Sequence, residues 1–151
     1  MAESGIPIKI RACDTMGYGV PYAGASMPRS VPGIVYGLRN YGGFPAELLE
    51  WHGHNDFYKA VVNSATAWLY GASSVNCSLL GIGERTGNTP LEAMVIEYAQ
   101  LRGTLDGMTP PSSATSRTTT SASWAITSRR TPRSWARAST PPRPASTPTA
   151  C

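Results

Sequence analysis

The 151-residue sequence lacks the features that would place it in a membrane or among disulfide-stabilised secreted domains. It has no run of about 20 apolar residues, the length that a transmembrane helix requires, and no apolar segment typical of a signal peptide. Its three cysteines are an odd number without paired spacing, which argues against a disulfide framework. We therefore expect Cys13 and Cys77 to be packed thiols, no contact with membranes, and a location in the reducing cytoplasm.

The part of the chain after Met108 lacks most residue types from which a folded domain is built. Residues 109–151 contain no Asp, Glu, Lys, Leu, Val, Phe, Tyr or Gly, and consist almost entirely of Ser, Thr, Pro, Ala and Arg. Such a composition cannot bury enough apolar surface to order the chain. The sequence therefore predicts a folded part at residues 1–108 and a disordered low-complexity C-terminal tail at residues 109–151.

The tail also gives the chain its basic character. The formal net charge is +4, and six of the 13 basic residues but none of the nine acidic ones follow Met108. Three origins are open: a frameshifted reading frame, which the abrupt change in composition favours, a genuine disordered linker, or a basic arm that binds nucleic acid. The arginines are scattered, with only Trp124 and Trp135 as aromatic residues among them, so we do not expect a nucleic acid partner.

What the sequence does contain is the run Glu-Trp-His-Gly-His-Asn-Asp at residues 50–56, which includes both histidines of the chain. Residues 48–52 are suited to a buried strand, and side chains two apart on a strand point to the same face. His52 and His54 would then lie side by side at the spacing needed to chelate one divalent metal. The alternative is that two histidines at a strand end serve as hydrogen-bonding groups.

Two further strands are expected to end in polar loops. Residues 8–13 lead into Asp14-Thr15 and a Gly/Pro loop, and residues 74–79 lead into the glycine-rich loop at residues 80–88. Ligands bind at such strand ends in parallel α/β folds. A plain turn would explain the glycines, but the opposite charges of Glu84 and Arg85 favour a functional loop that these two residues organise.

Strand, loop and helix follow one another three times. The helices are expected at residues 31–40, 57–70 and 90–102, each followed by glycine. Asp56 is expected at the start of the second helix, whose apolar stripe (Phe57, Val61, Ala65, Trp68) would pack on the sheet. Thr89 and Glu92 would form a capping box at the third. The pattern predicts an α/β fold, the last three βα units of a partial (β/α)8 TIM barrel.

The motifs at residues 14–19, 52–56 and 81–88 resemble the last three strand ends of the acetyl-CoA-dependent Claisen synthases. This family includes 2-isopropylmalate, homocitrate and Re-citrate synthases. The sequence at residues 51–57 and 67–71 is most similar to the Re-citrate and homocitrate branch. The resemblance covers about residues 6–106. It implies that the chain is a fragment of a barrel of about 250 residues and that the intact enzyme is a homodimer.

The resemblance also implies a set of roles. His52 and His54 would bind a divalent metal (Zn, Mn or Mg), with Asn88 as a weaker ligand, and Thr15 would donate a hydrogen bond to the carboxylate of the 2-oxo acid that acetyl-CoA attacks. The acidic ligand and the general base would lie outside this chain. The activity implied is that of an acyltransferase; the alternative is an inactive truncated product whose basic tail binds polyanions nonspecifically.

Overall fold

The computed structural model describes residues 5–6, 8–108 and 123–127, in which strands and helices alternate. Three parallel strands are each followed by a helix, and one further strand comes last. The elements are β1 (Ile10–Asp14), α1 (Val31–Asn40), β2 (Leu49–Gly53), α2 (Ala60–Tyr70), β3 (Ser74–Ser78), α3 (Leu91–Arg102) and β4 (Ser123–Thr127), with 3-10 turns at Ala46–Leu48 and Leu79–Gly81.

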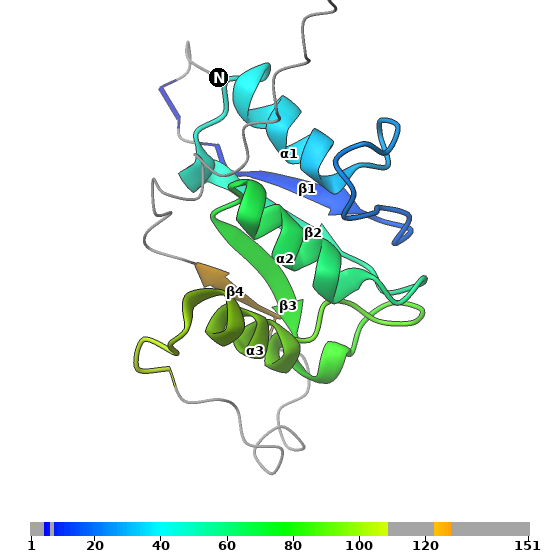
Figure 1. Ribbon diagram of the computed structural model, residues 1–151, viewed down its shortest axis with the longest axis vertical. Coiled ribbons are helices and arrows are strands. Elements are labelled where there is room, and N and C mark those ends of the chain that lie inside the picture. Colours follow the sequence, from blue (N-terminus) through cyan, green and yellow to red (C-terminus); the bar gives the residue numbers. More distant parts are fainter. Residues whose placement is uncertain (1–4, 7, 109–122, 128–151) are drawn as a thin grey trace, which may run out of the picture.

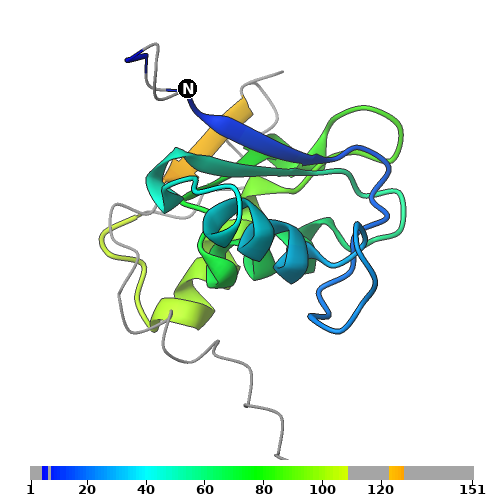
Figure 2. The same cartoon turned by 90° about the horizontal axis from the view of Figure 1, so that it is seen from above.

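The four strands form one sheet in the order β1-β2-β3-β4 (Figure 1). Strands β1, β2 and β3 are parallel neighbours, with Cys13 opposite His52 and His52 opposite Asn76. The helices α1, α2 and α3 all lie on one side of the sheet, as the view from above shows (Figure 2). The three predicted βα units are therefore confirmed, and the carboxyl ends of their strands meet at one edge.

Strand β4 differs from the expectation that nothing after Thr109 joins the fold. Ser123–Thr127 pairs antiparallel with β3, so that Ser78 lies opposite Ser123 and Ser74 opposite Thr127. An unpaired strand edge offers N–H and C=O groups to any extended segment, and the Trp, Ile and Thr of this stretch favour extended backbone. The rest of the predicted disordered tail, residues 109–122 and 128–151, lies outside the described residues.

The core lies between the sheet and the helices. Leu49 and Trp51 of β2 and Val75 of β3 are almost completely buried there. They pack with buried side chains of the helices, which include Val31, Val35, Ala67 and Met94. Cys77 belongs to this core, and its burial raises the pKa of its thiol to about 12, so it is a packed thiol as expected. The same expectation is wrong for Cys13, which is exposed because β1 is the outermost strand of the sheet. Among the described residues no helix is long and apolar enough to cross a membrane.

The second helix begins later than predicted. Phe57 and Tyr58 precede α2, and Tyr58 has a φ of +57°, a left-handed conformation that interrupts a helix. The predicted apolar stripe is therefore wrong at Phe57, which is 48% exposed. Val61 and Trp68 are only partly buried against the core, and small side chains such as Ala60 and Ala67 make the buried face instead.

The predicted capping box at the third helix is also wrong. Helix α3 begins at Leu91, with Pro90 as N-cap and no capping side chain. The Thr89 hydroxyl is buried and lies 2.9 Å from the hydroxyl of Ser64 in α2. The carboxylate of Glu92 accepts a hydrogen bond from the backbone N–H of Leu80 instead. Both side chains tie neighbouring segments together, so neither is left to cap its own helix.

Candidate metal centre

Backbone hydrogen bonds join the three loops that follow β1, β2 and β3. The N–H of His54 donates to the carbonyl of Asp14 over 3.2 Å, and the N–H of Asn55 donates to the carbonyl of Gly87 over 3.0 Å. His54 and Asn88 also form an isolated β-bridge. The structure therefore brings the loops that carry the sequence-predicted residues to one place at the strand ends.

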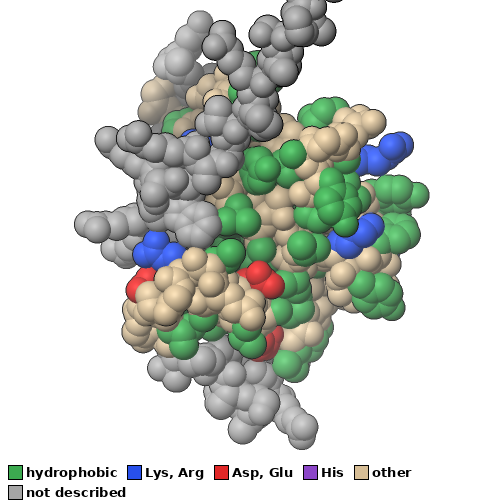
Figure 3. Space-filling view, in the orientation of Figure 1, with side chains coloured by type: hydrophobic (Ala, Val, Ile, Leu, Met, Phe, Trp, Pro, Cys, Tyr) green, Lys and Arg blue, Asp and Glu red, His purple; other side chains and the backbone are tan. Residues whose placement is uncertain are grey.

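The two imidazoles converge there through the same nitrogen. His52 Nε2 and His54 Nε2 lie 3.1 Å apart, and the rings are nearly perpendicular, at 86°. Two imidazole nitrogens bonded to one ion at about 2.1 Å lie roughly 3 Å apart, so this spacing fits a shared metal ion. No histidine is visible on the surface over the helices, where hydrophobic and charged side chains are scattered (Figure 3).

The surroundings of His54 favour the neutral form of its imidazole. Its side chain is only 6% exposed, and burial, followed by the neighbouring His52, lowers the pKa of the imidazole. Its Nδ1 has no hydrogen-bond partner among the described residues. A neutral imidazole has the lone pair that coordination requires, so burial favours coordination by His54.

The other ligands of a complete site are less evident. The amide oxygen of Asn88 lies against Gly83, 1.7 Å from where a Cβ at that glycine would be, so only glycine fits there while Asn88 has this orientation. The buried carboxylate of Glu50 faces Lys9 and Arg11 at 3.7 and 3.2 Å. Among the described residues no third His, Cys, Asp or Glu joins the histidine pair. The residues present fit a divalent ion held by two imidazoles.

Arg85 connects the three loops from the side. Its guanidinium makes two hydrogen bonds to the carboxylate of Asp56, at 2.9 and 3.2 Å, and another to the carbonyl oxygen of Thr15. The hydrogen bonds to Arg85 hold the pKa of Asp56 below its ordinary value. Glu84 is 79% exposed, with its carboxylate 3.8 Å from Arg85. Asp56 therefore does not start α2 as expected; the Asn55 side chain accepts the N–H of Ala60 instead.

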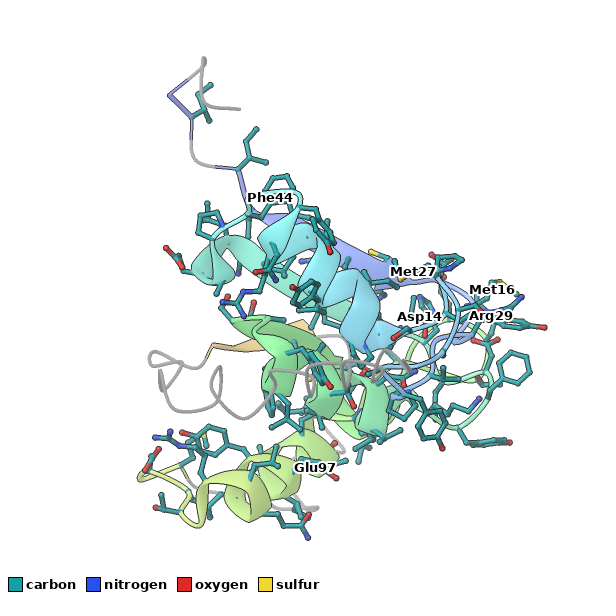
Figure 4. The ribbon with its side chains drawn as sticks, turned by 45° about the horizontal axis from the view of Figure 1, so that its top comes forward. Asp14, Met16, Met27, Arg29, Phe44 and Glu97 are labelled. Carbon is teal, nitrogen blue, oxygen red and sulfur yellow. The ribbon has the colours of Figure 1, made fainter. Side chains whose placement is uncertain are left out.

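A cavity of about 610 Å³ lies beside this site, at the end of β1 and the loop before α1. Asp14, Arg29 and Trp51 are among the residues that line it, and neither histidine is. Asp14, Met16, Met27 and Arg29 gather at this end of the molecule, whereas Phe44 lies near the other end of α1 (Figure 4). Thr15 is exposed directly after β1, next to the lining residue Asp14, and its carbonyl oxygen accepts the hydrogen bond from Arg85.

One polar neighbour of the histidines was missed in the sequence. Asn76 lies opposite His52 in the paired strands, and its Oδ1 is 2.9 Å from His52 Nδ1. An amide within a strand that also carries buried Val75 and Cys77 is a signal that could have drawn attention to it. His52 cannot be identified as the partner of Asn76 from the sequence, because neither segment alone determines the register between β2 and β3.

The chain is similar in sequence to a known family and to several synthases. The model of the HMGL-like family matches residues 1–122. A citrate (Re)-synthase of Clostridium kluyveri is 68% identical and one of Syntrophus aciditrophicus 58% identical, each over 106 residues, or 70% of this chain. A 2-isopropylmalate synthase of Acidimicrobium ferrooxidans is 41% identical over 86 residues, or 57% of the chain. The chain spans only 23%, 17% and 15% of these relatives, respectively.

Proposed function

We propose, because the chain belongs to the HMGL-like family, that it carries the metal-binding part of an acyltransferase that condenses acetyl-CoA with a 2-oxo acid. The domain of this family is a TIM barrel, which confirms the predicted fold class, and relatives named as synthases confirm the resemblance. The observation that carries the proposal is the convergence of His52 Nε2 and His54 Nε2 within 3.1 Å at the strand ends.

Each predicted site residue has a role in this proposal. His52 and His54 would hold a divalent metal (Zn, Mn or Mg), and Asn88, whose amide oxygen now lies against Gly83, would be a weaker ligand. When bound, the metal supplies a Lewis acid that polarises the carbonyl of the 2-oxo acid. The hydroxyl of Thr15 donates to the carboxylate of that acid.

Arg85 acts at a distance from the metal in this proposal. Its hydrogen bonds to Asp56 and to the Thr15 carbonyl hold the loops after β1 and β2 against the loop after β3, which carries Arg85. Glu84, whose carboxylate lies beside the guanidinium, has the same loop-organising role. No general base is assigned within this chain.

The names of the relatives narrow the choice of the acceptor. The two relatives with 68% and 58% identity are citrate (Re)-synthases, and citrate contains the carbon atoms of one acetyl group and one oxaloacetate. We therefore propose oxaloacetate as the 2-oxo acid of the intact enzyme, ahead of pyruvate, 2-oxoisovalerate and 2-oxoglutarate. In the condensation the acetyl methyl carbon loses a proton and bonds to the carbonyl carbon of the acid, whose C=O becomes a hydroxyl. Hydrolysis of the thioester then releases CoA.

A chimera tests this proposal independently of the length of the chain. The 106 matching residues would replace the corresponding segment of the Clostridium kluyveri citrate (Re)-synthase, and citrate formation would be measured. We expect an active chimera that His52→Ala or His54→Ala inactivates, while the control Ile96→Ala, at a site 58% exposed on α3, stays active. An inactive chimera, or activity that survives both histidine changes, would contradict the proposal.

The second candidate is an inactive product that binds polyanions through the arginines of its tail, which the charge distribution favours. The purified chain distinguishes the two candidates when CoA release from acetyl-CoA is measured with each of the four 2-oxo acids. We expect no turnover with or without metal, because the chain covers under a quarter of its relatives. Metal binding by the histidines supports the synthase origin, whereas heparin binding without metal binding supports the inactive product.

A further inference from the structure

The two histidines of the site are held in place by different means. His54 is buried, and its Nδ1 meets no partner among the described residues. His52 is half-buried, and its Nδ1 lies 2.9 Å from the Oδ1 of Asn76. Packing therefore fixes the first imidazole, while the second relies on one hydrogen bond to the neighbouring strand.

That hydrogen bond determines which nitrogen of His52 carries the proton. An amide oxygen can only accept, so the proton of a neutral imidazole facing Oδ1 must be on Nδ1. The lone pair is then on Nε2, the nitrogen that lies 3.1 Å from His54 Nε2. The reversed amide would donate to Nδ1 and place the proton on Nε2, where it would block coordination. The orientation of one amide thus decides whether His52 can bind a metal.

We propose that Asn76 is the positioning residue of this metal centre, which holds His52 in the Nδ1–H tautomer with Nε2 directed to the point shared with His54. The inference rests on the metal site of the proposed function and extends it to a residue that does not touch the metal. A group that orients a ligating histidine in this way fixes both the tautomer and the ring, and its loss costs about 10–100-fold in metal affinity.

The sheet makes Asn76 well suited to this role. His52 and Asn76 are directly opposite in the parallel pairing of β2 and β3, so their backbones are fixed relative to each other before any ligand binds. The amide reaches the ring from a rigid strand, while Asn88 reaches the site from a loop. Ser74, two residues earlier in β3 and on the same face, provides a matched control, because its hydroxyl has no partner among the described residues.

The test uses the full chain, purified without a histidine tag, and its two histidines make the spectra simple to assign. Long-range ¹H–¹⁵N NMR at about pH 8 identifies each tautomer in the metal-free protein. Titration with Co²⁺, followed by its visible absorption, measures affinity. Asn76→Leu removes the acceptor, Asn76→Asp retains it, and Ser74→Ala is the control.

We expect the Nδ1–H tautomer of His52 in the wild type, a mixture of tautomers in Asn76→Leu, and about 10–100-fold weaker Co²⁺ binding in that variant. Asn76→Asp should restore both, and Ser74→Ala should change neither. If Asn76→Leu does not fold, as judged by its thermal transition, Asn76→Thr replaces it, since a β-branched side chain suits a strand and is too short to reach the ring.

The outcomes separate this inference from the proposed function. Co²⁺ binding that is equally tight in wild type and Asn76→Leu, with an unchanged tautomer, would overturn the role of Asn76 and leave the metal site standing. A wild-type chain that binds no Co²⁺ would overturn the metal site itself and this inference with it. An Nε2–H tautomer in the metal-free wild type would show that the amide is reversed and would also reject the role.

Discussion

The helix-covered side of the sheet and the strand-end edge of this molecule are built from different kinds of contact. On the first, Leu49, Trp51 and Val75 are almost completely buried against the helices and make a core by apolar packing. At the second, His52 meets a neighbour from another segment at hydrogen-bond distance, and Arg85 joins three loops.

This difference leads to a testable separation of effects. Changes to the core should alter the free energy of unfolding, because burial of apolar area supplies most of it. Changes at the strand ends should alter metal binding, because the groups there are already oriented by the fold.

The largest effect is expected at Trp51, which is 1% exposed in the centre of β2. Trp51→Ala removes a large buried side chain and should lower the free energy of unfolding by about 3–5 kcal/mol. Urea unfolding followed by circular dichroism measures this change. Molecules that remain folded should bind Co²⁺ as the wild type does; a loss of metal affinity larger than the loss of folded protein would break the separation.

Replacing either histidine should give the opposite pattern. His52→Ala removes a ligand from a half-buried position, and Co²⁺ affinity should fall by more than about 100-fold, beyond the loss caused by removing a hydrogen-bonded neighbour of a ligand. The midpoint of urea unfolding, measured without metal, should move far less than in Trp51→Ala. If His52→Ala binds Co²⁺ normally, the ion is held elsewhere in the chain.

Gly53 lies between the two regions and should affect both. A Cβ at this position would be 3.2 Å from Trp51 Nε1 and 3.3 Å from Thr89 Oγ1, which is closer than side chains normally pack. Gly53→Ala should therefore cost about 1–3 kcal/mol of stability by overpacking. It should also weaken Co²⁺ binding, because any shift of the backbone at Gly53 displaces His52 and His54, which flank it. Gly37→Ala in α1, where a Cβ meets nothing within 4 Å, is the matched control.

The smallest effect is expected from Arg85→Lys. A lysine keeps the positive charge but cannot make the paired hydrogen bonds to Asp56 together with the bond to the Thr15 carbonyl. We expect unchanged stability and severalfold weaker Co²⁺ binding, since the loops are exposed and less firmly joined. Arg39→Lys, whose side chain contacts the Tyr70 carbonyl far from the site, should not weaken metal binding. Equal Co²⁺ affinities in Arg85→Lys and wild type would show that Arg85 does not support the metal site.

The sequence predicts the helix-covered region better than the strand ends, and the reason is physical. Strand β3 and helix α1 follow from local hydrophobic periodicity and from a terminating glycine pair. Tyr58 shows the limit of prediction from local patterns. Its left-handed backbone makes α2 begin at Ala60 and not at residue 57 as predicted. Thr89 shows this limit too, because its hydroxyl pairs with the hydroxyl of Ser64 in α2 and does not cap α3.

The candidate site follows the same rule. His52 and His54 can be paired from sequence because two residues on one strand share a face. Asn76 and Asp56 meet their partners across strands and loops, at separations of 24 and 29 residues, which one sequence does not reveal.

The central claim, that His52 and His54 bind one metal ion together, is tested most directly by X-ray absorption spectroscopy of the Zn²⁺-loaded full chain. Imidazole rings give characteristic multiple scattering, and their number per zinc can be counted at a distance of about 2.0–2.1 Å. We expect two imidazoles per zinc in the wild type and one in His54→Ala. One or no imidazole in the wild type, or a signal dominated by sulfur, would contradict it.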